Sequence, residues 1–538
     1  MSHVPARQEP DVDVAIIGAG FAGLYMLYRA RDVLGLRAKA YEASDGVGGT
    51  WHLNRYPGAR CDSESYVYCY SFSQELLDEW QWSGKYPAQP EILSYLNHVA
   101  DRFDLRRDIS LTNRVLSARF VDDDGLWHLD TQLDGEVTSR YLVTGIGLLA
   151  SAQYVPAIEG LDGFAGTWAH TGDWPTEGID FAGKRVAVIG TGSTGVQSIP
   201  VIAEQAAALT VFQRTPQFTV PAQHHSMSAD EMASIRANYA EVWDKAQHSA
   251  GGFPWSHNGR SALEDTPEEV EATFESLWQQ GGFRFIFASY RDLMIDRRAN
   301  ELASQFVRRK IREQVIDPRV RELLTPADHP FGAKRPIVDT NYFATYNRPN
   351  VSLVDLSDTP IKRITATGIQ TTEEHHDLDV IILATGFDAV TGPFMRMNIE
   401  GREGLALRDK WAAGPTSYLG LTVSGFPNMF MITGPGSVFG NIPVVVEHHV
   451  EWIAGLIAHM NKIGRSFAEA DPDAESAWAS AMADVASRTV VPLGDSWGTG
   501  KNIPGKPETV LFFLGSYGVY RARCDQVAAT DYTGIMLT

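Results

Sequence analysis

Two glycine-rich loops constrain this chain most, because each follows a short apolar strand and opens a helical pattern. The first loop, after the strand at Val12–Ile17, contains Gly18, Gly20 and Gly23; the second, after Arg185–Ile189, contains Gly190, Gly192, Ser193, Thr194 and Gly195. In such a strand–turn–helix the first glycine permits the tight turn, the second lets a pyrophosphate approach the backbone, and the third lets helix and strand pack closely. The helix N-terminus then faces the anion. We therefore predict an α/β fold with two dinucleotide-binding, Rossmann-like domains.

The residue that follows the second strand of each unit differs in charge between the two units. Glu42 lies 24 residues after Gly18, and Arg214 lies 24 residues after Gly190. A carboxylate accepts hydrogen bonds from ribose hydroxyls and repels a 2′-phosphate, whereas a guanidinium binds that phosphate in a bidentate manner. The first site is predicted to take FAD and the second NADPH, with Thr215 beside Arg214. The alternative for Arg214 is an arginine on the solvated surface.

Composition excludes several classes of function. A net charge of −20 opposes binding to nucleic acid, which rests on neutralising phosphates. No apolar run reaches the roughly 18 residues of a membrane span, and residues 1–10 lack the apolar core of a secretory signal. Cys61 and Cys69 are too far apart in sequence for the redox pair of a flavin disulfide reductase, and with Cys524 they fit neither a disulfide framework nor a zinc site. We expect a cytoplasmic protein with free thiols, no metal, and no nucleic-acid or membrane partner.

The chain is predicted to contribute two segments to each nucleotide-binding domain. The FAD-binding domain comprises residues 1–145 and 386–538, and the NADPH-binding domain comprises residues 150–220 and 331–385. Residues 221–330 form a helical insertion between the two NADPH segments. Apolar segments that run into glycine turns, at 142–147 and 380–386, are typical of the strands that return such a chain from one domain to the other.

Helix signals mark the insertion and the C-terminal part. Two helix starts are predicted by capping boxes, Ser228 with Glu231 and Thr266 with Glu269. Two helix ends are predicted, at Asp317-Pro318 for a helix with an apolar face over 302–315 and at Gly464 for a helix with an apolar stripe over 446–460. The stripe over 446–460 is spaced as in a buried helix. No role is assigned to His448 and His449 beside it.

A twelve-residue stretch between the two loops carries the most specific signal. Its fixed positions are Phe164, Gly166, His170, Thr171, Trp174 and Pro175, which match the fingerprint FxGxxxHTxxWP. Further matching segments are 48–51, 54–59, 334–336 and 497–507. With these motifs the chain resembles the Baeyer–Villiger monooxygenases, most closely the cyclohexanone and phenylacetone monooxygenase branch, over nearly its whole length.

The resemblance implies an NADPH- and O2-dependent flavin monooxygenase that inserts one oxygen atom beside a ketone carbonyl. Its nucleophile is an anionic C4a-peroxyflavin, which a fixed cation keeps deprotonated. Arg335 matches the active-site arginine, and Asp62 matches the carboxylate that orients it. Lys334 would point the opposite way along an extended segment and join Arg214 at the 2′-phosphate.

The same resemblance implies further contacts with the cofactors. NADP+ is expected to stay bound through the oxygen steps. The implied cofactor contacts are Thr50, Trp51, Asp62, Gln89 and Trp497, the last on a mobile loop near 495–507. For several of these residues a purely structural role stays open: Trp51 and Trp174 as core aromatics, His170 as a satisfied buried histidine, and Asp62 with Arg335 as an interdomain ion pair.

The segment 434–443 is predicted to line the substrate pocket through Gly436, Val438 and Phe439. It is two residues shorter than in the phenylacetone-type enzymes and closer to the cyclohexanone type, which suggests cyclic or aliphatic ketones. The protein is expected to act on a small ketone and O2 as a monomer or a weak homo-oligomer. Two rival interpretations remain: a flavin-dependent N- or S-oxygenase, and a non-catalytic NADPH-binding or redox-sensing protein.

Overall fold

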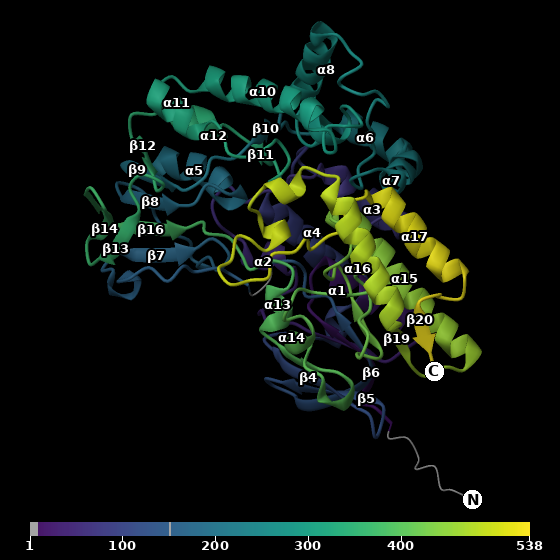
Figure 1. Ribbon diagram of the computed structural model, residues 1–538. Helices are drawn as coiled ribbons and strands as arrows, with labels where there is room; N and C mark the ends of the chain where they lie inside the picture. The colour runs from purple at the N-terminus through teal and green to yellow at the C-terminus, as the bar shows by residue number, and fades with distance from the viewer. Residues whose placement is uncertain (1–8, 150–151) are drawn as a thin grey trace, which may run out of the picture.

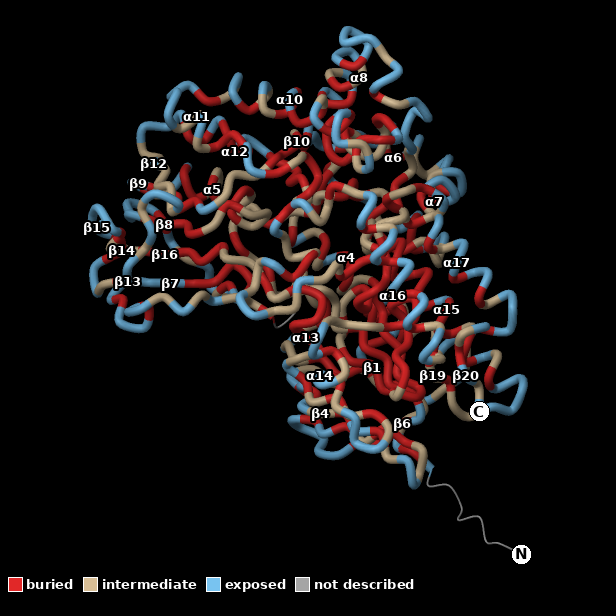
Figure 2. Tube along the Cα trace, in the orientation of Figure 1, coloured by how far each residue is buried: buried red, intermediate tan, exposed pale blue. Residues whose placement is uncertain are grey.

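The computed structural model describes residues 9–149 and 152–538, which form two α/β lobes with a helical region across one end (Figure 1). Residues 1–8, on which most of the signal-peptide expectation rests, and residues 150–151, where the NADPH segment was predicted to begin, lie outside the described part. Within that part, every helix is too short or too polar to cross a bilayer. Each lobe has its own buried core (Figure 2).

The first lobe is built on a sheet with the order β17-β4-β5-β6-β1-β2-β3, and β18 also pairs with β6. The strands are β1 Val12–Ile17, β2 Ala38–Tyr41, β3 Ile109–Ser110, β4 Val115–Val121, β5 Leu126–Thr131, β6 Gly135–Thr144, β17 Asn398–Glu400 and β18 Met429–Met431. β1 runs parallel to β2 and β6, whereas β4, β5 and β6 form an antiparallel meander. The strand predicted at Val12–Ile17 is confirmed, and its last four residues are buried because helices and loops cover both faces.

The second lobe contains an all-parallel sheet with the order β12-β9-β8-β16-β7. Its strands are β7 Thr167–His170, β8 Arg185–Ile189, β9 Ala208–Gln213, β12 Val351–Asp355 and β16 Val380–Leu383. β8 and β16 lie in the middle, so the second glycine loop and the turn at Gly386 leave the same edge of the sheet. In open α/β sheets this carboxyl edge is where ligands bind.

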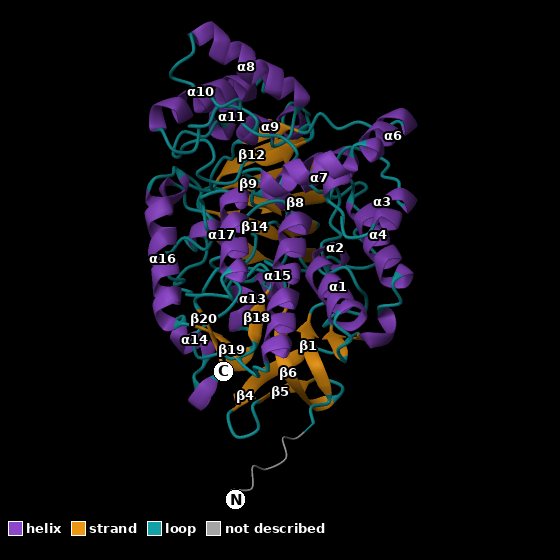
Figure 3. Ribbon diagram, turned by 90° about the vertical axis from the view of Figure 1, so that its right-hand side faces the viewer, coloured by secondary structure: helices purple, strands orange, loops and turns teal. Residues whose placement is uncertain are grey.

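Each glycine loop leads directly into a helix: α1 Phe21–Tyr28 follows β1, and α5 Ser193–Gln205 follows β8. α1 is buried from Phe21 to Leu27, because it lies against its sheet on one side and against α15 on the other. α15 (Ile442–Ile463) contains the predicted apolar stripe and ends at Gly464, whose φ of 67° only glycine adopts at low cost. Figure 3 shows α15 beside α1 and α17 (Tyr517–Ala529).

Further helices complete the two lobes. They are α2 Thr50–Leu53, α3 Gln74–Glu79, α4 Gln89–Arg102, α12 Tyr342–Thr345, α13 Gly392–Met395, α14 Leu407–Lys410 and α16 Pro472–Ser487. Of these, α12 packs against α5 in the second lobe. Three small sheets pair β10 (Thr219–Pro221) with β11 (Ile337–Asp339), β19 (Ala468–Ala470) with β20 (Ile535–Leu537), and β13, β14 and β15 (Ile361–Thr365, Gly368–Thr371, His375–Asp377) with one another.

The region between β10 and β11 is helical, in six segments. They are α6 Ala229–Ala237, α7 Tyr239–His248, α8 Pro267–Gln280, α9 Arg284–Phe287, α10 Arg297–Gln314 and α11 Pro318–Leu324. The capping box predicted at Thr266 is present in full with Glu269. The box predicted at Ser228 forms only in part: Ser228 accepts the amide of Glu231, but the Glu231 carboxylate contacts His225 instead of the Ser228 amide.

The predicted end of the helix over 302–315 at Asp317-Pro318 needs a correction. α10 already ends at Gln314, and Asp317 caps the next helix by accepting hydrogen bonds from the amides of Arg319 and Val320. An Asp-Pro pair cannot continue a helix, but it is equally well suited to begin one, because Asp is a good N-cap and Pro fits the first turn. The Asp317-Pro318 pair therefore marks the start of α11 as well as preventing α10 from continuing.

Candidate active site

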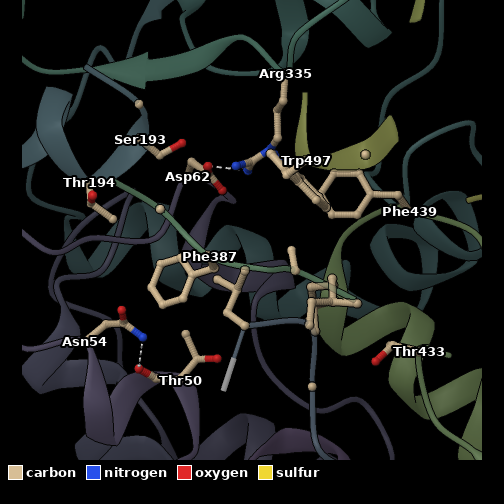
Figure 4. A pocket seen from close by; sticks show the side chains of 18 of the residues that line it. Thr50, Asn54, Asp62, Ser193, Thr194, Arg335, Phe387, Thr433, Phe439 and Trp497 are labelled. Carbon is tan, nitrogen blue, oxygen red and sulfur yellow. Dashed lines mark hydrogen bonds and ion pairs between the residues drawn. The ribbon is translucent and has the colours of Figure 1, made fainter. Parts of the chain in front are cut away.

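One cavity of about 1880 Å³ lies where the two glycine loops, the insertion and the C-terminal segment meet. The predicted site residues in its wall are Gly18, Gly20, Glu42, Thr50, Trp51, Asp62, Gly190, Gly192, Ser193, Thr194, Arg214, Thr215, Lys334, Arg335, Val438, Phe439 and Trp497. They come from segments more than 470 residues apart in the chain, and the fold brings them into a single space. Figure 4 shows Ser193 and Thr194 on one side of this space, with Trp497 and Phe439 on the other.

The first loop has the geometry of a pyrophosphate cradle. A Cβ on Gly23 would lie 1.8 Å from the carbonyl oxygen of Gly18, so only glycine lets α1 approach β1 this closely. α1 has no side-chain N-cap and no acidic residue in its first turn. Its N-terminal amides are therefore free for an anion, to which the helix dipole adds.

The carboxylate of Glu42 is buried at the edge of the same loop. Its oxygens accept hydrogen bonds from the amides of Ala19 and Ser44, both at 2.8 Å, and from the Ser44 hydroxyl at 2.8 Å. These donors fix the carboxylate in the cavity wall at the end of β2. A negative charge held there disfavours a 2′-phosphate, as predicted for a site that takes FAD.

The second loop repeats this design. A Cβ on Gly195 would lie 2.3 Å from the carbonyl oxygen of Gly190, and α5 also lacks both a side-chain cap and acidic residues in its first turn. The hydroxyl of Thr194, the second residue of α5, accepts a hydrogen bond of 3.1 Å from the hydroxyl of Thr171. The fingerprint is therefore connected to the start of α5, directly after the second glycine loop.

Two cations lie together at the far side of this loop. Lys334 and Arg214 both line the cavity, and burial together with the nearby Arg214 charge lowers the pKa of Lys334, against the opposing effect of Asp328 and Asp495. Bringing two cations together costs energy that an anion between them would recover. This arrangement is what a 2′-phosphate site needs.

Substituting Lys334 by alanine is expected to lower the preference for NADPH over NADH. A hydrogen bond to a charged group contributes about 1.5–3 kcal/mol, so the ratio of kcat/KM for the two coenzymes should fall about 10–100-fold. Steady-state kinetics with both coenzymes measure this ratio. Lys184→Ala, an exposed lysine of the same lobe, is the control and should leave the ratio as it is. An unchanged ratio in Lys334→Ala would remove Lys334 from the phosphate site.

Arg335 and Asp62 form an ion pair across the cavity (Figure 4). The guanidinium carbon of Arg335 lies 5.1 Å from the ring centroid of Phe283 and 5.7 Å from that of Phe439. The side chain of Arg335 is 28% exposed, so its charge is open to the cavity while its direction is fixed. A guanidinium held by a carboxylate and two aromatic rings has little freedom to turn away.

Aromatic side chains from the C-terminal part form the wall beside Arg335. Trp497 packs edge-on against Phe439 at 5.2 Å and against Phe512 at 5.5 Å. The segment that carries Trp497 is attached to the turn after β16: Asn502 donates to the carbonyl of Phe387 at 2.9 Å, and Lys506 pairs with Asp388 at 2.6 Å. Its predicted mobility stays a prediction.

None of the six fixed fingerprint residues lines the cavity, and Gly166 is exposed at the surface. Phe164 and Trp174 are buried in the cores on the two faces of the second sheet. A Cβ on Gly166 would lie 2.4 Å from the carbonyl oxygen of Asp379. The amide of Thr171 donates to the carbonyl of Leu383 at 3.1 Å, which fixes the fingerprint beside the turn at Gly386.

His170 is the one titratable residue of the fingerprint. It is 3% exposed, its Nδ1 accepts the amide of Gly172 at 3.0 Å, and its ring packs edge-on against Phe387 at 5.6 Å. Burial lowers the pKa of His170 to about 4 from its ordinary value of 6.5. The ring is therefore neutral at pH 7, and its contacts are with the backbone of Gly172 and the ring of Phe387.

The pKa of His170 predicts a pH dependence of stability. As the pH falls below 6.5, the unfolded chain binds a proton at this residue before the folded protein does, so stability is lost between pH 6.5 and about 4. Against His170→Asn, which keeps an acceptor for Gly172 but does not titrate, the wild type should lose about 3 kcal/mol more over this range. Urea unfolding of both proteins at pH 7.5 and 4.0 measures the difference. Parallel pH profiles would contradict the buried neutral state.

Gln89 and Gly436, like the helix-packing glycines Gly23 and Gly195, lie away from the cavity wall. The carboxamide of Gln89 donates to the carbonyl of Trp51 at 2.5 Å, and its amide donates to the carbonyl of Ala59 at 2.9 Å. Gly436 packs against Ser417, where a Cβ would lie 2.5 Å from its hydroxyl oxygen. Gln89 and Gly436 support wall segments here, so their direct roles toward cofactor and substrate stay predictions.

Two residues that the insertion contributes to the site were not predicted from the sequence. Phe253 and Phe283 line the cavity from loops beside α7 and α9, and Phe283 contacts Arg335. No local pattern marks them, because a phenylalanine after a pair of glycines carries no signal of its tertiary partner.

The chain is similar to known flavin-binding monooxygenases in both sequence and structure. The family described as flavin-binding monooxygenase-like matches residues 11–229. A Baeyer–Villiger monooxygenase of Pseudooceanicola batsensis is 44% identical over 98% of this chain and 96% of its own length. The phenazine N-monooxygenase PhzNO1 of Lysobacter antibioticus is also 44% identical, over 98% and 97%. The crystal structure of the OTEMO complex with FAD and NADP superposes with a TM-score of 0.95 at 41% identity, covering 99% of this chain and 100% of that one.

Proposed function

The chain belongs to the Baeyer–Villiger monooxygenases, and from this premise we propose that oxygen transfer to its ketone substrate depends on Arg335 held by Asp62. The enzyme uses FAD and NADPH. It converts ketone, O2, NADPH and H+ into ester or lactone, NADP+ and water, so that one oxygen atom enters the product and the other enters water. The ion pair between Arg335 and Asp62 in the wall of the shared cavity is the observation that carries the proposal.

The residues present fit both cofactors. The uncapped N-termini of α1 and α5 offer free amides to two pyrophosphates, and the glycine contacts leave no space for side chains there. When bound, FAD supplies the redox chemistry by taking a hydride from NADPH and activating O2. We propose that Glu42 holds the FAD ribose and that Arg214 and Lys334 hold the 2′-phosphate of NADPH.

The proposed role of Arg335 is electrostatic. Oxygen transfer to a carbonyl needs a nucleophilic, negatively charged oxygen, and a preorganised cation beside it favours the charged form. A guanidinium carries its charge at any relevant pH, so it can serve in this way throughout turnover. Asp62 keeps the group directed without removing its charge from the cavity, since the arginine side chain is still partly exposed there.

The wall around Arg335 suits an apolar ketone. Val438, Phe439, Phe512 and Phe283 present apolar surface, and Trp497 closes one side. Burial of a hydrocarbon ring against such a wall is favourable, and only its carbonyl oxygen needs a polar partner. We propose hydrophobic cyclic or aliphatic ketones as the substrate class.

A second candidate is N-oxygenation, favoured by the 44% identity with a phenazine N-monooxygenase. Both activities fit the two-nucleotide layout, but a heteroatom is oxidised by an electrophilic oxygen and gains nothing from a cation that preserves an anion. The pair formed by Arg335 and Asp62 therefore favours the ketone reaction.

The test is a comparison of substrates. The purified holoenzyme is given NADPH and ¹⁸O2 with cyclohexanone in one reaction and with phenazine in another. We expect ketone-dependent NADPH oxidation and a lactone with one ¹⁸O by mass spectrometry. A labelled N-oxide from phenazine, without lactone from cyclohexanone or from a panel of larger cyclic ketones, would favour the second candidate. NADPH oxidation with neither product would favour a redox-sensing role.

The proposed function also includes the cellular location and the oligomeric state of the enzyme. The three cysteines are free and buried, which is compatible with a reducing cytoplasm. We propose a cytoplasmic enzyme that acts as a monomer or a weak homo-oligomer, because all proposed site residues come from one chain. Light scattering across a range of protein concentrations measures the assembly state.

A further inference from the structure

Two short segments hold Arg335 from different parts of the chain. One is 62–64 in the first lobe, where Asp62 forms the ion pair with Arg335. The other is 283–284 at the start of α9 in the insertion, where the ring of Phe283 faces the guanidinium. The remaining residues of these segments, Glu64 and Arg284, form an ion pair with each other.

Glu64 is a buried carboxylate that three polar side chains contact. Its side chain is only 2% exposed. Besides the two contacts with Arg284, of which the second measures 3.0 Å, it accepts the hydroxyl of Tyr66 at 2.5 Å and lies 3.5 Å from the ammonium of Lys85. A carboxylate with four such contacts from three side chains has a fixed position, and it fixes the backbone only two residues from Asp62.

Arg284 is held equally firmly on the insertion side. Its guanidinium carbon lies 4.1 Å from the ring centroid of Trp255, and its side chain is 21% exposed. Burial lowers the pKa of Arg284 to about 10, which leaves it charged at neutral pH. Because Phe283 is the preceding residue and the N-cap of α9, any shift of Arg284 moves the ring that contacts Arg335.

We propose that Glu64 and Arg284 are a positioning pair for Arg335. The bidentate pair joins the first lobe to the insertion at the one place where both neighbouring segments contact the active-site guanidinium. Through Asp62 it sets the carboxylate partner, and through Phe283 it sets the aromatic partner. This inference rests on the proposed role of Arg335 in oxygen transfer.

A positioning role explains the ion pair between Glu64 and Arg284 better than a contribution to stability does. The desolvation of two buried charges largely offsets their attraction, so a buried ion pair contributes little net stability compared with apolar residues of the same size. A bidentate guanidinium–carboxylate pair does fix distance and angle, however. Small displacements of catalytic groups are costly, since a shift of about 1 Å can slow a reaction by roughly 100-fold.

The experiment measures coupling in Arg284→Met and in Glu64→Gln. Coupling is the amount of lactone formed for each NADPH consumed; the uncoupled route transfers the two electrons of NADPH to O2 and, with two protons, gives hydrogen peroxide. We expect coupling to fall about 10–100-fold in both variants, with peroxide accounting for the difference. The rate of anaerobic flavin reduction by NADPH should stay within about twofold of the wild type, because neither nucleotide loop is altered.

Lys410→Met is the matched control for a purely structural effect. Lys410 pairs with Glu475 at 3.0 Å, and the exposures of the two side chains, 18% and 5%, resemble the 21% and 2% of Arg284 and Glu64. The control should lower the melting temperature like Arg284→Met but keep the wild-type coupling. Glu64→Gln keeps the volume of the side chain, so it covers the case in which Arg284→Met does not fold.

Wild-type coupling in a folded Arg284→Met or Glu64→Gln protein would overturn the positioning role, whatever the loss of stability. The proposed function is tested separately by Arg335→Ala. If that variant loses coupling and Arg284→Met does not, the positioning pair is wrong and the role of Arg335 stands. If Arg335→Ala keeps coupling, the proposed function itself is wrong.

Discussion

Arg335→Ala is expected to abolish oxygen transfer while NADPH still reduces the flavin. The guanidinium lies between Asp62, Phe283 and Phe439 and directs its charge into the cavity. Removing one preorganised electrostatic group of this kind typically lowers the rate by about 10²–10³-fold. Lactone formation should fall by that factor, NADPH should be consumed with formation of hydrogen peroxide, and single-turnover flavin reduction should keep its rate.

Two further variants make the prediction for Arg335 more specific, one conservative and one a control. Arg335→Lys keeps the charge but loses the planar group that contacts both rings and the carboxylate, so partial recovery at most is expected. Arg402→Ala is the matched control, because Arg402 also pairs with a carboxylate, that of Asp122 at 2.8 Å, and lies 5.4 Å and 5.7 Å from the ring centroids of Phe120 and Phe467. Arg402 is not part of the cavity wall, and Arg402→Ala should keep full coupling. Lactone formation by Arg335→Ala at the wild-type rate would contradict the assigned role.

The parts of the fold that follow from local pattern were predictable from sequence. The strands at Val12–Ile17 and Arg185–Ile189 have the predicted bounds, because an apolar run before a glycine turn leaves few alternatives. The helix with the stripe over 446–460 ends at Gly464 for an equally local reason, the left-handed backbone that glycine adopts. The ambiguity of Asp317-Pro318 was local as well: the same pair ends one helix pattern and begins the next.

The site was predictable only where a motif carried it. Asp62 and Arg335 are 273 residues apart, and their pairing followed from the family resemblance rather than from spacing. Glu64 and Arg284 are 220 residues apart and belong to no motif, so nothing in the local sequence of either residue predicts that they pair. Gln89 is the opposite case. Its motif predicted a contact with a cofactor, but in the fold its carboxamide donates to the backbone carbonyl of Trp51. Tertiary contacts between separate lobes are the information that local sequence lacks.

Gly23→Ala is expected to yield a protein that folds but retains almost no FAD. The new methyl carbon would lie 1.8 Å from the carbonyl oxygen of Gly18, a backbone atom that cannot turn aside. α1 must therefore move away from β1, and the amides at its N-terminus leave the positions that the pyrophosphate needs. Overpacking of this kind costs about 1–3 kcal/mol or more, which corresponds to roughly 10–100-fold weaker FAD binding. The ratio of absorbance at 450 nm to that at 280 nm in the purified protein measures the loss.

The second loop offers the matched experiment, since its glycine has the same contact in the other lobe. In Gly195→Ala the methyl carbon would lie 2.3 Å from the carbonyl oxygen of Gly190, so FAD should be retained while the KM for NADPH rises about 10–100-fold. Gly163→Ala has no atom within 4 Å of the added carbon and should change neither quantity. If Gly23→Ala retained its flavin and Gly195→Ala lost it, the assignment of FAD to the first loop and NADPH to the second would have to be reversed. Because the acid Glu42 follows the first unit and the base Arg214 the second, we expect the opposite: each substitution should affect only its own nucleotide.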